Sequence, residues 1–191
     1  MAAGGPGPRT FSAHAAPAAG IPASSPAESP AAAPLVAIVL DDFGYTKKNL
    51  PVLKEAGVPV TMAILPNTPH AGEAADFAAA NGMEIILHLP MEPESRTESL
   101  EKDTVMVGMN ETEIRDIFER DLKKVPGAKG VNNHMGSRAT SDEQVMKIVL
   151  GEIGRKGMYF LDSMTTSNPV SEDIAAGIGL PRAQRDIFLD N

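Results

Sequence analysis

The feature that most constrains this chain is the segment 35–44, in which an apolar run ends at two adjacent carboxylates. Residues 35–40 are all apolar, and such a run is typical of a strand buried on both faces of a sheet. Asp41 and Asp42 follow it directly. Ligands bind at the carboxyl ends of strands in parallel α/β sheets and barrels, so this acid pair indicates a functional site. The structural alternative is that Asp42 caps a turn or helix while Asp41 faces water.

Strand patterns and amphipathic helix patterns alternate along the rest of the chain. The clearest helix is expected over 110–125, where Asn110 and Glu113 form a capping box and an apolar stripe follows. Further helices are expected over 46–56, 69–81, 141–156 (capped by Ser141 with Gln144) and 171–176. Strands are expected over 35–40, 60–65, 83–88, 129–133, 158–161 and 182–187. This βαβα order predicts a mostly parallel sheet or barrel with right-handed crossovers.

The first 34 residues differ in composition from the remainder. They are dominated by Ala, Pro, Gly and Ser, so we expect 1–34 to be a disordered tail or linker and 35–191 to be one domain. About six strands are expected there, whereas a closed (β/α) barrel has eight. We therefore expect a domain that is C-terminally incomplete, poorly soluble or oligomeric, and of little activity.

Composition excludes several classes of protein and site. The net charge of −8 and the pI of about 5.0 argue against a nucleic-acid partner. The chain has no cysteine, which excludes disulfides, zinc–thiolate sites and cysteine nucleophiles. We find neither a transmembrane stretch of 18 or more apolar residues nor the pattern of a secretory signal.

Polar side chains recur where the expected strands end. His88 ends the third strand, Asn133 and His134 end the fourth, and Asp162 ends the fifth. A parallel sheet would bring them to one rim with the acid pair. Two imidazoles and one carboxylate form a well-known ligand set for zinc or a similar metal, with a fourth position left open. Each residue also has a structural reading, as a core histidine, turn residue or helix cap, and only the joint pattern favours a site.

Other folds with paired acids fit less well. Response-regulator receivers need a phosphorylated Asp after the third strand and a Lys after the fifth, where this chain has His88 and Asp162. Haloacid-dehalogenase phosphatases need Asp-x-Asp, whereas Asp41 and Asp42 are adjacent. No phosphate-binding loop of the Gly-x-x-x-x-Gly-Lys type occurs. The other histidines do not compete, because His14 lies in the tail and His70 at an expected helix start.

The motifs, taken in order, resemble those of the divergent polysaccharide deacetylases, distant relatives of the NodB-homology carbohydrate esterases. The resemblance covers about residues 35–191. It rests on Leu-Asp-Asp-Phe-Gly (40–44), Ala-Ile-Leu-Pro (63–66), His-Leu-Pro-Met-Glu (88–92), Asn-Asn-His-Met-Gly-Ser (132–137) and Phe-Leu-Asp-Ser (160–163). It implies a distorted (β/α) barrel.

The resemblance also implies a site. It gives a divalent metal, zinc, held by Asp42, His88 and His134, with Asp41 as general base toward the attacking water. In the main esterase family the third-strand motif carries two histidines four residues apart, and here Glu92 takes the second position. The family continues to a later Gly-His-Pro segment that this chain lacks. Weaker candidates for substrate binding or oxyanion stabilisation are Asn133, Ser137, Arg138, Glu92 and Asp162.

The implied function is metal-dependent hydrolysis that removes acetyl groups from an envelope polysaccharide or glycan, in the periplasm or cell envelope. The alternative is a non-catalytic module that binds a glycan or partner and retains the metal site. Asp41 favours the enzyme, since a binding module needs no base there, whereas Glu92 and the missing end favour the module. Tryptophan is absent, so Tyr45 and Tyr159 would have to provide any aromatic platform for a sugar.

Overall fold

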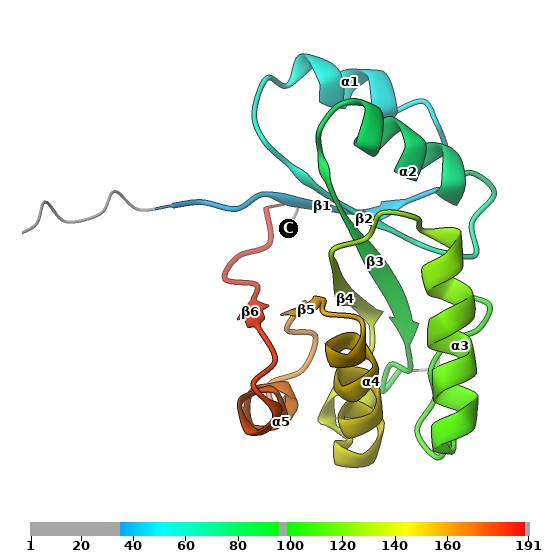
Figure 1. Cartoon of the computed structure of the whole chain (residues 1–191), viewed down its shortest axis with the longest axis vertical. Helices are drawn as coiled ribbons and strands as arrows, with labels where there is room; N and C mark the ends of the chain where they lie inside the picture. Colours follow the sequence, from blue (N-terminus) through cyan, green and yellow to red (C-terminus); the bar gives the residue numbers. More distant parts are fainter. Residues whose placement is uncertain (1–34, 96–98, 190–191) are drawn as a thin grey trace, which may run out of the picture. The chain divides into compact units, whose positions relative to one another are not determined.

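The sheet is wholly parallel and follows the order of the chain. The computed structural model describes residues 35–95 and 99–189, so the tail expected over 1–34 lies outside it. In the described part, six strands pair in sequence order (Figure 1). They are β1 (Val39–Phe43), β2 (Thr61–Ile64), β3 (Glu84–Met91), β4 (Gly130–Met135), β5 (Tyr159–Asp162) and β6 (Arg182–Gln184). This barrel-like but unclosed arrangement confirms the predicted α/β class.

A helix follows each of the first five strands in the described chain. The helices are α1 (Leu50–Glu55), α2 (Ala71–Ala80), α3 (Glu111–Lys124), α4 (Glu143–Arg155) and α5 (Ser171–Ile178), with a 3₁₀ turn η1 (Ala139–Ser141) before α4. The predicted capping box at α3 is confirmed, because Asn110 accepts a hydrogen bond from the Glu113 N–H and Glu113 accepts one from the Asn110 N–H. None of these helices is long and apolar enough to cross a membrane.

The hydrophobic core lies between the sheet and these helices. On the strands it includes Met62, Ile64, Leu87 and Leu89, all fully buried. Helix α2 contributes four buried alanines, Ala71, Ala74, Ala75 and Ala78, whose spacing of three and four residues puts them on one helical face. Small side chains on that face let α2 approach β2 and β3 closely.

The predictions about the first strand and about the cap of α4 are wrong. The strand expected over 35–40 begins at Val39, and its predecessors Leu35 and Val36 are 96% and 85% exposed, so it is not buried on both faces. The reason is that β1 lies at one edge of the sheet and pairs only with β2 in the described chain. Helix α4 is capped by Asp142, which accepts from the Val145 N–H at 2.9 Å, because Ser141 is taken up in η1.

Candidate metal centre

The acid pair lies in an irregular stretch of β1. Leu40 pairs with Met62 and Phe43 with Ile64, so two residues on β1 oppose one on β2. This is the pattern of a β-bulge, which bends a strand and re-aims its side chains. Asp42 has a φ of 57°, in the left-handed region that few residues other than glycine adopt. Backbone strain of this kind clusters at functional sites.

Strands β3 and β4 bring two histidines to Asp42. The Asp42 Oδ1 atom lies 3.0 Å from His134 Nδ1 and 3.3 Å from His88 Nε2. The two imidazole nitrogens are 3.2 Å apart, and the rings meet edge to face. One ligand atom from each of the three residues thus falls within 4.8 Å of the others. We call Asp42, His88 and His134 the triad. It joins the carboxyl-terminal halves of β1, β3 and β4, the side of a parallel sheet where a metal centre is expected.

A neighbouring amide fixes the tautomer of His88. His88 is paired with Asn132 in the β3–β4 ladder, and its Nδ1 atom lies 2.9 Å from Asn132 Oδ1. The Asn132 amide nitrogen in turn donates to Ser163 Oγ at 3.3 Å, which leaves the amide oxygen as the acceptor. His88 therefore donates from Nδ1 and presents a lone pair on Nε2 toward Asp42. This is the arrangement of a metal-ligating histidine held by a hydrogen-bond partner behind it.

The electrostatics of the triad favour an ionised Asp42. Hydrogen bonding to His134, and then to His88 when both of its ring nitrogens carry a proton, holds the pKa of the Asp42 carboxyl well below its usual range, while partial burial opposes this shift. The Asp42 side chain is 54% exposed, whereas that of His88 is 3% exposed. The centre therefore has a buried inner side and an open outer side that water or a substrate can reach.

Glu92 belongs to a different cluster. It is buried at the end of β3, and its Oε1 accepts from Arg138 Nη1 at 2.7 Å while Oε2 accepts from the Val107 N–H at 2.7 Å. The Ser137 hydroxyl oxygen accepts from the Glu94 N–H at 2.9 Å. These weaker candidates thus tie the loop after β3 to the segment after β4. The structure does not bring Glu92, Ser137 or Arg138 into the triad.

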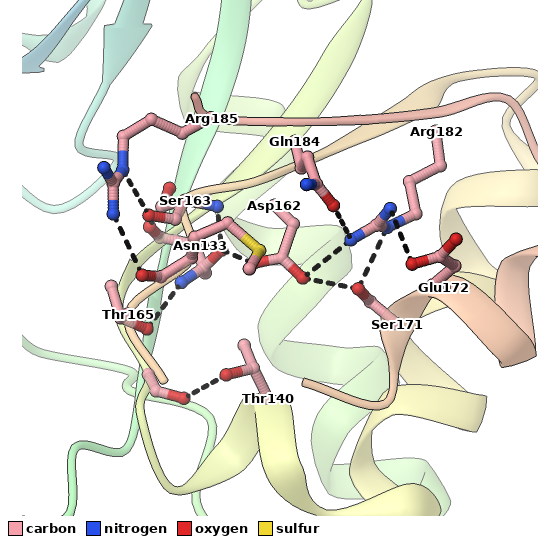
Figure 2. A network of polar contacts seen from close by, with 12 residues as sticks. Asn133, Thr140, Asp162, Ser163, Thr165, Ser171, Glu172, Arg182, Gln184 and Arg185 are labelled. Carbon is pink, nitrogen blue, oxygen red and sulfur yellow. Dashed lines mark hydrogen bonds and ion pairs between the residues drawn. The ribbon is translucent and has the colours of Figure 1, made fainter. Parts of the chain in front are cut away.

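Asn133 and Asp162 are held in a second network, at the ends of β4 and β5 (Figure 2). The Asn133 amide donates to the Met135 carbonyl at 2.7 Å and accepts from the Ser163 N–H at 2.9 Å. Asp162 is fully buried and accepts from the Met164 N–H, the Ser171 hydroxyl and Arg182. These bonds link β4, β5, α5 and β6, and neither the Asn133 nor the Asp162 side chain is hydrogen-bonded to a side chain of the triad.

Asn132 is the residue of this site that the sequence-based prediction missed. Side chains alternate between the two faces of a strand, so Asn132 shares its face with His134 whereas Asn133 points to the other. This alternation in the sequence could have indicated that Asn132, and not Asn133, lies on the side of the metal ligands. Asp41, the predicted base, is exposed beside Asp42 and forms no hydrogen bond or ion pair with another described residue.

Known proteins match this chain over most of its length. The family model of the divergent polysaccharide deacetylases matches residues 38–191. An uncharacterized protein of Escherichia coli (strain K12), YibQ, is 40% identical over 156 residues, which cover 82% of this chain and 49% of the relative. An uncharacterized protein of Haemophilus influenzae (strain ATCC 51907 / DSM 11121 / KW20 / Rd) is 35% identical over 156 residues, covering 82% of this chain and 55% of its own length. The chain thus spans about half the length of these curated relatives.

The fold has a similar solved structure. The crystal structure of an uncharacterized protein from Agrobacterium tumefaciens C58 superposes with a TM-score of 0.76 at 26% identity, over 81% of this chain and 64% of that one. The shared fold and the extent of the family match agree with the motifs at the strand ends. The chain belongs to the divergent polysaccharide deacetylase family.

Proposed function

We propose that the chain is a metal-dependent hydrolase that removes acetyl groups from an envelope polysaccharide or glycan. The observation that carries the proposal is the convergence of three ligand atoms, from Asp42, His88 and His134, in the carboxyl-terminal halves of three strands. Family membership supports the reaction class. Activity on such a substrate would be exercised in the periplasm or cell envelope, and we propose that location.

The spacing of the triad suits zinc. Ligands at 2.0–2.1 Å in a tetrahedral zinc site lie about 3.3 Å from one another. The three distances in the triad are 3.0, 3.2 and 3.3 Å. Because His88 donates from Nδ1, the lone pair on its Nε2 faces the Asp42 carboxylate, and a cation between them relieves that repulsion. A bound divalent cation supplies Lewis-acid chemistry, acidifying water and polarising an acetyl carbonyl.

Asp41 is the group that we assign to proton transfer. It adjoins a triad residue in the bulge, is exposed to solvent, and has no partner among the described residues that would hold its oxygens. A carboxylate so placed can accept a proton from water as that water attacks a carbonyl carbon. General base catalysis of this kind contributes typically 10²–10⁴-fold to a rate.

One observation favours the alternative of a non-catalytic glycan-binding module. The side chains predicted to stabilise an oxyanion, Asn133 and Ser137, are hydrogen-bonded to other groups. The two functions differ in turnover. Release of acetate from an N-acetylglucosamine oligomer, measured with and without a chelator, separates them: chelator-sensitive release supports the enzyme, and binding of the oligomer without release supports the module.

The metal assignment has its own test. We expect one zinc ion per chain, and we expect His88→Ala or His134→Ala to abolish stoichiometric zinc binding in calorimetry while the far-ultraviolet circular dichroism stays similar. His70→Ala is a matched control, because His70 lies at the start of α2 and pairs with Glu73. Full-affinity zinc binding by both triad variants would overturn the assignment.

A further inference from the structure

The rim beside the triad carries an exposed tyrosine that the proposed mechanism does not use. Tyr45 follows Asp42 by three residues in the loop after β1, and it is 53% exposed. Its hydroxyl donates to the carboxylate of Glu101, 56 residues away in the chain. That bond, followed by partial burial and the nearby charges of Glu101 and Asp42, raises the pKa of Tyr45 to about 12. The ring is therefore neutral, oriented and close to the triad.

The segment that supplies Glu101 is held firmly at the same rim. The Thr104 hydroxyl donates to the Glu101 carbonyl at 2.7 Å, and the Asn67 amide donates to the Lys102 carbonyl at 2.9 Å. Val105 then pairs with the end of β3, where its N–H donates to the Pro90 carbonyl at 2.9 Å. The partner of the Tyr45 hydroxyl is thus fixed relative to β3, the strand that carries His88, and the ring is pre-positioned.

We propose that Tyr45 and Glu101 form a sugar-binding subsite next to the triad, in which the tyrosine ring stacks on a pyranose ring and Glu101 accepts a hydrogen bond from a sugar hydroxyl. An aromatic ring with a polar tip suits a ligand that is apolar on one face and wet at its edges. The second carboxylate oxygen of Glu101 has no partner among the described residues, so it can accept that bond. This subsite rests on the proposed function, whose substrate class it narrows.

The negative charges at this rim disfavour binding of anionic glycans. Asp41 and Glu101 are both carboxylates, and the whole chain has a net charge of −8. A chain of uronic acids would place further negative charge against them, which like-charge repulsion disfavours. The subsite therefore fits a neutral chain of N-acetylhexosamine units better than an anionic glycan.

A second tyrosine–glutamate pair provides a matched control. Tyr159 donates to Glu84 Oε1 at 2.5 Å, and these residues begin β5 and β3, at the amino ends of the strands and away from the triad. The chain has two tyrosines and no tryptophan, so Tyr159→Phe leaves Tyr45 as the only source of tyrosine fluorescence. That variant controls for the loss of a tyrosine hydroxyl bonded to a glutamate, and its fluorescence reports on the proposed subsite.

The experiment measures binding of an N-acetylglucosamine tetramer to metal-free protein. We expect the tetramer to bind the wild type and Tyr159→Phe with equal affinity, and to change the fluorescence of Tyr159→Phe in a saturable way. Calorimetry should show that the affinity for the tetramer falls by about tenfold or more in Tyr45→Ala and by less in Tyr45→Phe and Glu101→Gln. A hyaluronan tetrasaccharide, which alternates uronic acids, should bind more weakly than the neutral tetramer.

Three results would overturn the subsite: no binding of the tetramer by the wild type, equal affinity of Tyr45→Ala and Tyr159→Phe, or no fluorescence change in Tyr159→Phe at saturation. Failure of the proposed function looks different. If the tetramer binds in a manner that depends on Tyr45 but the protein holds no zinc and releases no acetate, the subsite stands and the hydrolase does not. If the protein binds zinc and releases acetate equally well in the wild type and in Tyr45→Ala, the hydrolase stands and the subsite does not.

Discussion

Two adjacent carboxylates have different surroundings at the end of β1. Asp42 Oδ1 contacts both imidazoles of the triad, whereas Asp41 forms no hydrogen bond or ion pair with another described residue. Neighbouring residues of a regular strand point to opposite faces, and the bulge in β1 interrupts that alternation at these two residues. A candidate ligand and a candidate base are therefore adjacent residues in one bulge.

We expect substitution of Asp42 to affect zinc binding and substitution of Asp41 to affect turnover. Asp42→Asn should lose zinc, because an amide is a poor ligand in this set. Asp41→Asn should keep zinc and lose most turnover, by about 10²–10⁴-fold. Zinc calorimetry and acetate release on the same samples check this, with Asp76→Asn on the exposed face of α2 as control. Equal loss of metal from both variants would contradict the division of roles, though not the site.

Asn132 should influence metal affinity without touching the metal. Without its bond to Asn132, His88 can carry its proton on Nε2, where it blocks the lone pair that would bind the metal. Loss of such a partner typically weakens metal binding by about 10–100-fold. We expect that loss in Asn132→Ala and restored affinity in Asn132→Asp, which keeps an acceptor oxygen. Zinc calorimetry measures both. An Asn132→Ala protein that binds zinc like the wild type would show that His88 needs no such support.

The sequence predicted the triad residues but not their supporting contacts. Asp42, His88 and His134 lie in the carboxyl-terminal halves of their strands, where chain order and sheet topology alone bring them near one another. The bond from His88 to Asn132 spans 44 residues, and it becomes visible only once the β3–β4 register is known. The ion pair between Glu92 and Arg138 spans 46 residues and has the same origin. Register, more than residue type, decided what could be predicted.

At the scale of elements, α3 buries a carboxylate that the proposed chemistry does not use. Asp121 is fully buried, its Oδ1 accepts from the Asn67 amide at 3.0 Å, and its Oδ2 has no partner in the described chain. Lys124 Nζ lies 3.6 Å from Oδ1 and also contacts Asp103. Burial raises the pKa of Asp121 to about 6, against the hydrogen bond from Asn67. Helix α3 is thus docked through a group that titrates near neutrality.

This carboxyl should make stability depend on pH in an unusual direction. The folded protein holds the Asp121 proton more tightly than the unfolded chain, so the stabilisation is fully present below about pH 4 and is lost as pH rises through about 6. Between pH 4 and 7.5 we expect the wild type to lose on the order of 1–3 kcal/mol more unfolding free energy than Asp121→Asn does. Urea titrations at both pH values measure the difference, and identical pH profiles would contradict it.

Helices were predicted better than strand ends. The capping box of α3 uses residues three apart, so local sequence decides it. The cap of α4 is Asp142 and not the predicted Ser141, because η1 occupies Ala139–Ser141. That turn is stabilised by hydrogen bonds from the Arg138 and Ala139 N–H groups to the Glu92 carbonyl, just after β3. Strand β3 likewise runs to Met91, beyond the predicted end at His88, because β4 offers partners as far as Met135.

At the scale of the whole molecule, the described sheet has two edges with apolar neighbours. Beside β1, Leu35 and Val36 are 96% and 85% exposed, and beyond β6, Ile187 and Leu189 are 72% and 83% exposed. An edge strand offers unpaired backbone groups to another chain, and natural proteins protect such edges with charged residues, especially lysine. Here exposed apolar residues flank both edge strands, and neither strand carries a lysine.

We therefore expect this chain to self-associate at micromolar concentrations. Val36→Lys combined with Leu189→Lys should shift it toward the monomer, because the new charges protect both edges. Val52→Lys makes the same charge change at a 66% exposed position on α1 and should leave the association unchanged. Size-exclusion chromatography with light scattering measures the mass. A monomeric wild type would show that these edges do not associate.

The order of the strands also bears on how the protein is made. Each strand pairs with the one that precedes it in the chain, so pairing can proceed from the amino end while the ribosome is still adding residues. The triad draws on β1, β3 and β4 and needs no residue beyond His134. Its ligand set would be complete before β5 and β6 emerge. A cation bound at that stage would favour the paired strands over the unfolded chain, and would hold β1–β4 in register until β5 and β6 are added.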